Sequence, residues 1–113
     1  MTEISVVYSE GRPVALNAAG HSDYAPEGSD IVCAGVSALL QALLYGFERV
    51  LKDRGFRSRV DEVDTVISLD WRLLPPDNSA LLVETIIGSL KEIARAYPEH
   101  VRILEVDTDD YVF

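Results

Sequence analysis

The sequence contains very little cysteine. Of its 113 residues only Cys33 is a cysteine, so no disulfide can form within the chain. A lone thiol stays reduced in the cytoplasm, and we expect the protein to act there. A zinc site needs about four ligands, and Cys33 with the histidine at position 21 falls short of that number. We therefore expect neither a metal site nor another cofactor.

Basic residues are also scarce. Ten Lys and Arg stand against nineteen Asp and Glu, which gives a formal net charge of −9 and a pI of about 4.5. Binding nucleic acid without sequence preference requires Lys and Arg that displace phosphate counterions, and anionic membranes attract basic segments. We expect no direct nucleic-acid partner and no membrane partner. The charge would attract basic partners, although it can equally serve solubility alone.

We expect no targeting segment. Residues 1–5 contain neither a basic start nor the long apolar run of a signal peptide. Ser37, Gln41 and Gly46 interrupt the longest apolar stretches, so we expect no transmembrane helix.

Apolar residues, in contrast, are plentiful. They make up 48% of the chain, which is enough for a core and argues against disorder. The length suits one domain of common size, and no repeat or linker divides the chain. We predict a single domain over residues 1–113.

Hydrophobic periodicity and turn residues predict an α+β fold. We expect strands at 3–9, 14–19, 57–63, 65–73 and 101–106. One helix should start at Ser29-Asp30 and end at Arg54-Gly55, and a second should lie between Pro75 and Pro98. The order β-β-α-β-β-α-β predicts a mainly antiparallel sheet with both helices packed on one face.

Two of these segments have informative apolar patterns. In the strand 65–73, Ile67, Leu69, Trp71 and Leu73 fall on one face, which is typical of a half-buried strand. The first helix is apolar on more than one side. One small subunit has little surface to cover such a helix, so we expect a homodimer that buries apolar surface.

Cys33 lies close to the predicted start of the first helix. With Ser29 as the N-cap, the thiol falls at the end of the first turn. Unpaired backbone N–H groups and the helix dipole there favour a thiolate, which is the reactive form. The alternative is that Cys33 is an inert residue of the core.

His21 lies twelve residues upstream of Cys33, in a predicted loop over residues 20–28. Its imidazole could take the proton of the thiol and later protonate a leaving amine. This spacing is by itself a weak signal, and a loop histidine can simply be a solvated polar residue.

Asp30 and Ser37 share a helix face with Cys33. Asp30 could orient His21 as the third member of a triad, or it is an ordinary first-turn acid whose charge opposes a thiolate. Ser37 could donate a hydrogen bond near the sulfur or bond back to its own helix.

Two glycines, Gly20 and Gly28, bracket the predicted loop. Glycine supplies mobility or a positive φ angle, and a mobile loop that carries a catalytic histidine would close over substrate as a lid. The alternative is a pair of ordinary turns.

The segment Gly20 to Ala38 resembles the ribosomal-processing cysteine protease family, Prp. It contains a Gly-His pair, a short glycine-containing loop, the run Asp-Ile-Val-Cys-Ala and a nearby serine. The resemblance implies a cysteine endopeptidase that acts as a homodimer. The implied roles are nucleophile for Cys33, general base for His21, support for Asp30 and Ser37, and a substrate loop containing Gly20, Ser22 and Gly28.

The chain departs from the family at two places. Ser22 stands where the family most often has alanine, and the acidic, aromatic tail after Val106 is not a family feature.

The resemblance also implies a substrate. The family removes a short N-terminal extension from large-subunit ribosomal protein twenty-seven, so we expect a basic ribosomal protein precursor as the partner. Two other functions stay open on the same fold: a non-catalytic binding protein in ribosome assembly, and a thiol redox sensor that uses Cys33.

Overall fold

The computed structural model describes residues 1–20, 27–61, 63 and 66–108. The elements in chain order are β1 Thr2–Ser9, β2 Arg12–Ala19, α1 Glu27–Tyr45, the π-helical η1 Gly46–Leu51, β3 Arg57–Asp61, β4 Val66–Asp70, the 3-10 helix η2 Pro76–Asn78, α2 Ala80–Ala96 and β5 Val101–Asp107. This is the predicted order of strands and helices.

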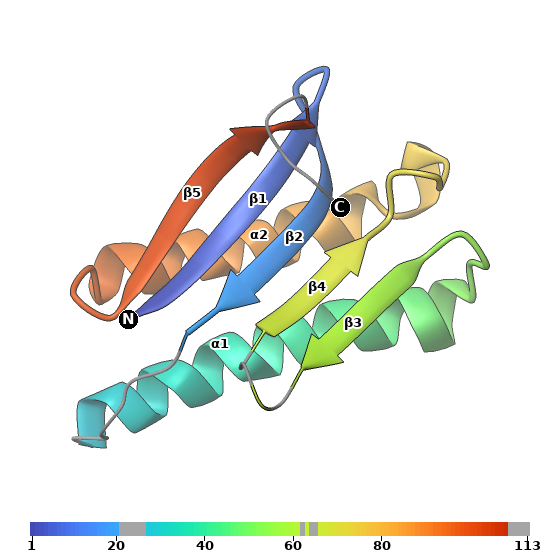
Figure 1. The fold of residues 1–113 in the computed structure, drawn as a ribbon. Helices are drawn as coiled ribbons and strands as arrows, with labels where there is room; N and C mark the ends of the chain where they lie inside the picture. Colours follow the sequence, from blue (N-terminus) through green and yellow to red (C-terminus); the bar gives the residue numbers. More distant parts are fainter. Residues whose placement is uncertain (21–26, 62, 64–65, 109–113) are drawn as a thin grey trace.

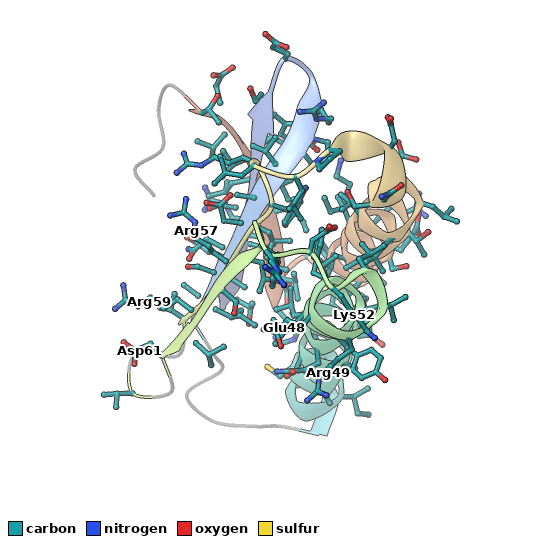
Figure 2. All side chains as sticks on the ribbon, turned by 90° about the vertical axis from the view of Figure 1, so that its right-hand side faces the viewer. Glu48, Arg49, Lys52, Arg57, Arg59 and Asp61 are labelled. Carbon is teal, nitrogen blue, oxygen red and sulfur yellow. The ribbon has the colours of Figure 1, made fainter. Side chains whose placement is uncertain are left out.

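The strands form one sheet with both helices on the same face. The strand order is β3-β4-β2-β1-β5. Three of the four pairings are antiparallel, and only β1 with β5 is parallel. Figure 1 shows the sheet in front of the two helices, and Figure 2 shows the sheet and the helices as two layers. The structure confirms the predicted fold class.

The core lies between these two layers. Because side chains alternate along a strand, Ile4 and Val6 of β1 face the helices together with Leu16 of β2 and Leu69 of β4, and the register places them side by side. They form one buried cluster with the inner face of α1 and with α2. Each fully buried side chain of this size contributes about 1.5–3 kcal/mol.

Three aromatic side chains stack at the end of the helical layer that lies away from Cys33. Phe47 of η1 stacks on Phe56 with ring centroids 4.6 Å apart and on Trp71 at 5.4 Å. The indole Nε1 of Trp71 donates a hydrogen bond to the carbonyl oxygen of Pro13 at 3.0 Å. The stack therefore ties the end of the first helical segment to β2 and to the segment after β4.

Several predicted boundaries need correction. The strands predicted at 57–63 and 65–73 are shorter, at Arg57–Asp61 and Val66–Asp70. Leu73 lies beyond the end of β4 and is 68% exposed, so it does not share the buried face of Leu69. The chain turns there because Trp71 pairs with β2 and Leu74 closes the turn with a backbone hydrogen bond to Trp71.

The first helix starts earlier than predicted. It begins at Glu27, two residues before the predicted N-cap Ser29. A carboxylate in the first turn is favoured by the helix dipole, so Glu27 is itself a start signal. At the other end the helix widens into the π-helical η1, which ends at Leu51 and is followed by Lys52 with a left-handed φ of 54°.

One helical segment in the described residues, Ile31–Leu51, is long and apolar enough to cross a membrane by length and composition alone. This criterion does not test the expectation of no transmembrane helix, which stays a prediction. Core helices of globular domains meet the same criterion, and one side of this segment supplies Val36, Leu40 and Leu43 to the core.

Candidate active site

A pocket of about 370 Å³ opens at the end of the sheet, over the first half of α1. Its position follows from the topology, because β2 and β3 end here while β1 and β4 begin (Figure 1). Its volume lies in the range of pockets that bind small ligands and short peptide segments. The lining residues are Thr2, Ala18, Ala19, Gly20, Cys33, Val36, Ser37, Leu40, Gln41, Val60, Asp61, Val66 and Ile67.

The helical wall of this pocket carries two of the predicted site residues. Cys33 and Ser37 are one turn apart on α1, and both line the pocket. Cys33 is half-buried and Ser37 is exposed. The next turn adds Leu40 and Gln41. Thus the thiol is not an inert residue sealed in the core; it faces a cavity that a ligand can enter.

The sheet wall brings a third predicted residue to the same pocket. Gly20 directly follows β2, has a φ of +91° and lines the pocket. A Cβ at this position would overlap the carbonyl oxygen of Met1. Both the positive φ and the close approach require glycine here. The chain therefore leaves β2 in a direction that only glycine permits.

The remaining predicted site residues are only partly described. His21 and Ser22 lie outside the described residues. Asp30 lies on α1, one turn before Cys33, but its side chain is outside the described part. Gly28, which the sequence analysis assigns to the loop, is the second residue of α1. The predicted loop therefore does not extend to Gly28.

The earlier helix start also moves Cys33. With α1 beginning at Glu27, Cys33 is the seventh helical residue and lies in the second turn. Its backbone N–H is within the range of ordinary helical hydrogen bonds, and the favourable effect of the helix N-terminus falls off after the first turn. Cys33 therefore does not lie in the first turn of the helix, and that prediction is wrong.

Sequence reasoning did not find the polar groups on the sheet side of the pocket. Asp61, at the end of β3, is half-buried and accepts a hydrogen bond from the backbone N–H of Val63 at 3.0 Å. It also lies 3.8 Å from a guanidinium nitrogen of Arg59. No local signal links Asp61 to Cys33, because the fold alone brings them to one pocket. Gln41 is different, since its spacing from Ser37 places both on one helix face.

Two further features of the charged residues concern metal binding and the α2–β5 side of the molecule. In the described part of the chain no three His, Cys, Asp or Glu side chains gather closely enough to hold a metal ion. On the α2–β5 side, Lys91 Nζ donates a hydrogen bond to Glu105 at 3.1 Å, which raises the pKa of Lys91. The pocket thus offers a thiol, hydroxyl and amide groups on mostly apolar walls.

A thiol at the mouth of such a pocket suits nucleophilic chemistry, and comparison with known proteins decides the class. The sequence pattern of the family described as cysteine protease Prp matches residues 1–102. The chain belongs to the Prp family. It is a cysteine protease of the ribosomal-processing kind, as the resemblance of the Gly20 to Ala38 segment implies.

Curated relatives agree with this Prp assignment. The ribosomal processing cysteine protease Prp of Mycoplasma pneumoniae is 32% identical over 96 residues, which is 84% of this chain and 90% of the relative. The Prp of Bacillus subtilis is 34% identical over 90 residues, covering 74% and 78% of the two chains.

Solved structures share the Prp fold over nearly the whole chain. A crystal structure of a Streptococcus mutans protein superposes with a TM-score of 0.82 at 25% identity and covers 96% of each chain. The structure of Staphylococcus aureus Prp in complex with a substrate peptide gives a TM-score of 0.80 at 23% identity and covers 93% of this chain and 99% of the other. These likenesses show the fold.

Proposed function

We propose that this Prp family member removes a short N-terminal extension from large-subunit ribosomal protein twenty-seven, with Cys33 as the nucleophile and His21 as the general base. One observation carries the proposal. Half-buried Cys33 and Gly20, the residue that precedes His21 in the chain, line the same pocket. Acyl transfer through a cysteine requires a histidine close to the thiol, and His21 directly follows Gly20 in the sequence.

The proposed reaction has two steps. His21 takes the proton of Cys33, and the thiolate attacks the scissile carbonyl carbon. The C–N bond then breaks as His21 returns the proton to the leaving amine, which leaves a thioester on Cys33. In the second step His21 removes a proton from water, and the resulting hydroxide displaces the thiol to release the carboxylic acid.

Asp30 and Ser37 are assigned supporting roles in this proposal. Asp30 precedes Cys33 by three residues on α1, and its proposed role is to hold His21 in the required tautomer. Ser37 lines the pocket one turn after Cys33. Its proposed role is to donate a hydrogen bond to the substrate or to the sulfur.

The substrate class follows from charge and from the pocket walls. The chain carries a formal net charge of −9, which attracts a basic ribosomal protein over distance. The walls of the pocket are mainly Val, Ala, Leu and Ile side chains, which favours an apolar residue of the substrate next to the cut. Cys33 is the sole cysteine of the sequence, and we propose that the protein acts in the cytoplasm, where a thiol stays reduced.

We further propose that the protein acts as a homodimer. The side of α1 that points away from the sheet carries exposed Ile31, Ala34, Ala38, Ala42 and Tyr45. These residues recur at three- and four-residue steps, so they form one apolar stripe along the helix. A second copy of the chain would cover this stripe.

The test is cleavage of the precursor protein followed by mass spectrometry. The native enzyme should release the N-terminal extension at one site, and Cys33→Ala should release none. Ser37→Ala should slow cleavage, whereas Ser89→Ala on α2, whose hydroxyl only donates to the carbonyl of Thr85, should not. Cleavage by Cys33→Ala would refute the mechanism. Binding without cleavage by the native enzyme would favour a non-catalytic assembly factor.

A further inference from the structure

The outer strand β3 offers a free edge beside the Cys33 pocket. It is the last strand of the sheet and pairs with β4 on one side. In an antiparallel ladder, alternate residues direct their backbone N–H and C=O groups to the partner strand, and the intervening residues direct theirs away. Within the described part of the chain no strand pairs with this outer edge. It therefore presents a row of backbone donors and acceptors to an incoming strand.

The two sides of β3 have different chemistry. Arg57 and Arg59 point away from the helices (Figure 2), and they lie 3.2 Å from Asp70 and 3.8 Å from Asp61, respectively. By alternation, Ser58 and Val60 face the helical layer. Val60 is 53% exposed although it is apolar, and it lines the pocket together with Cys33. Charge thus occupies one side of the edge, and the other side continues into the pocket.

The arginines on the charged side of β3 can be explained as protection against aggregation. Arginine on an edge strand discourages pairing with a second copy of the same strand. The same explanation does not cover the pocket side, where Val60 leaves an exposed apolar surface at the point where β3 reaches the wall of the cavity.

We propose that the substrate binds as an additional strand along the free edge of β3. This inference rests on the proposed function, because the occupant is the extended N-terminal segment of the precursor. Backbone hydrogen bonds to β3 would supply affinity, and every second side chain of the segment would turn toward α1. Those side chains enter the pocket beside Val60, and the scissile bond follows at Cys33.

This arrangement predicts that recognition lies on one side of the cut. Only the end of β3 formed by Val60 and Asp61 reaches the pocket, so the bond that is cut must lie at one end of the added strand. The residues that pair with Arg57–Val60 then all belong to the same side of that bond. The opposite edge strand, β5, does not line this pocket, and so it serves as an internal control.

The first experiment tests the backbone contacts. A synthetic peptide with the N-terminal sequence of the precursor is prepared with a single N-methyl group moved one residue at a time, and kcat/KM is measured with the native enzyme. We expect a loss of about tenfold or more at every second residue on one side of the cut, because each such group removes one donor to the edge. A uniform effect, or no effect on either side, would overturn strand addition.

The second experiment uses a matched pair of variants. Val60→Asp places a charge on the pocket side of β3, whereas Val63→Asp places one on a side chain that is already 92% exposed at the neighbouring turn. We expect kcat/KM for the peptide to fall about tenfold or more for Val60→Asp and to stay within about twofold of native for Val63→Asp. The Tm should match the native value in both variants. Equal kcat/KM in the two variants would refute the inference.

Backbone exchange supplies a readout that does not need turnover. In the Cys33→Ala variant, hydrogen exchange of alternate β3 amides should slow when the peptide is added, while the amides of β5 should not change. Failure of the native enzyme to cut the peptide at all would remove the proposed function and this inference together. If the native enzyme cuts the peptide but β3 exchange does not change and no N-methyl position lowers kcat/KM, then only the strand-addition inference is refuted.

Discussion

At the scale of single residues, the members of the candidate site reach the pocket for different structural reasons. Cys33 and Ser37 share a pocket wall because they are four apart on one helix. Gly20 reaches the same pocket because its backbone adopts a conformation that other residues avoid. His21 follows Gly20 in the sequence, so the backbone at Gly20 sets the direction in which the histidine-bearing segment starts. The predictions at this scale concern the base and that glycine.

Replacing the base should separate chemistry from folding. His21→Ala should lower kcat/KM by roughly 10²-fold or more, which is the usual contribution of a positioned general base, with little change in Tm. Asp30→Asn should cost less, because an orienting group acts only through the histidine. Steady-state kinetics on the precursor peptide with thermal denaturation checks both. A His21→Ala protein that fails to fold would indicate a structural histidine instead.

Replacing Gly20 tests the geometry of the chain as it leaves β2. Gly20→Ala should destabilise the fold by about 1–3 kcal/mol from the positive φ, with an additional loss because the new Cβ would overlap the Met1 carbonyl oxygen. Gly11→Ala is the matched control, since Gly11 has a φ of +77° but no atom within 4 Å of the added Cβ. Chemical denaturation should show the larger loss for Gly20→Ala, and only that variant should also lose activity. Equal losses would show that the contact with Met1 does not matter.

At the scale of elements, α1 contributes to three different surfaces. Its inner face forms the core with β1, β2 and β4, its N-terminal half carries Cys33 and Ser37 along the pocket, and its outer side bears the apolar stripe. The helix can approach α2 closely because Gly46, where η1 begins, is buried and lies against Leu82. This contact fixes the position of α1 over the sheet and therefore the position of the thiol.

Two glycines in the helical layer should respond in opposite directions. At Gly46 a Cβ would overlap the side chain of Leu82, so Gly46→Ala should destabilise the protein by about 1–3 kcal/mol through overpacking. At Gly88, inside α2, an added Cβ meets no atom within 4 Å. Gly88→Ala should stabilise the protein by about 1 kcal/mol, because alanine has the higher helix propensity. Denaturant unfolding of both variants measures the difference, and stabilisation by Gly46→Ala would contradict the close packing of the two helices.

At the scale of the whole molecule, net charge and exposed apolar surface govern association. Acidic residues outnumber basic ones by nine, since the chain has nineteen of the former and ten of the latter. Such a molecule attracts a basic precursor at long range and then depends on short-range contacts at the pocket. The stripe on α1 is a different surface, and it is suited to a second copy of the chain rather than to a charged partner.

Salt should weaken capture of the precursor without moving the cut. Raising ionic strength from about 0.1 M to 1 M shortens the Debye length from about 10 Å to about 3 Å, so the association rate with the basic precursor should fall while the released fragment keeps its mass. A neutral peptide that contains only the residues around the cut is the control and should respond weakly. An association rate with the intact precursor that does not depend on salt would argue against long-range charge attraction.

The dimer prediction can be tested on the apolar stripe of α1. Tyr45→Glu adds a charge to a side chain of the stripe that is 63% exposed in one protomer, and it should shift a micromolar sample toward monomer in sedimentation. Tyr97→Glu is the matched control, because Tyr97 is 44% exposed and lies at the end of α2. A native protein that sediments as a monomer at micromolar concentration would contradict the homodimer.

The sequence alone was sufficient for the order of strands and helices and for the shared face of Cys33 and Ser37. Both depend on periodicities that are local to the chain, of about 3.6 residues in a helix and 2 in a strand. The ends of helices and strands were harder to predict from the sequence, as at Glu27 and Leu73. Competing start signals and tertiary contacts decide where an element ends. The Gly20 to Ala38 segment also carried the family signature, since its residues lie close together in the sequence.

Only the tertiary structure decided what surrounds the thiol. Asp61 and Val60 reach the pocket because β3 lies at the edge of the sheet and ends above α1. The Met1 carbonyl constrains Gly20 because β1 and β2 pair in one particular register. The parallel pairing of β1 with β5 joins opposite ends of the chain. Such contacts depend on which distant segments pack together, and no local periodicity of the chain encodes that choice.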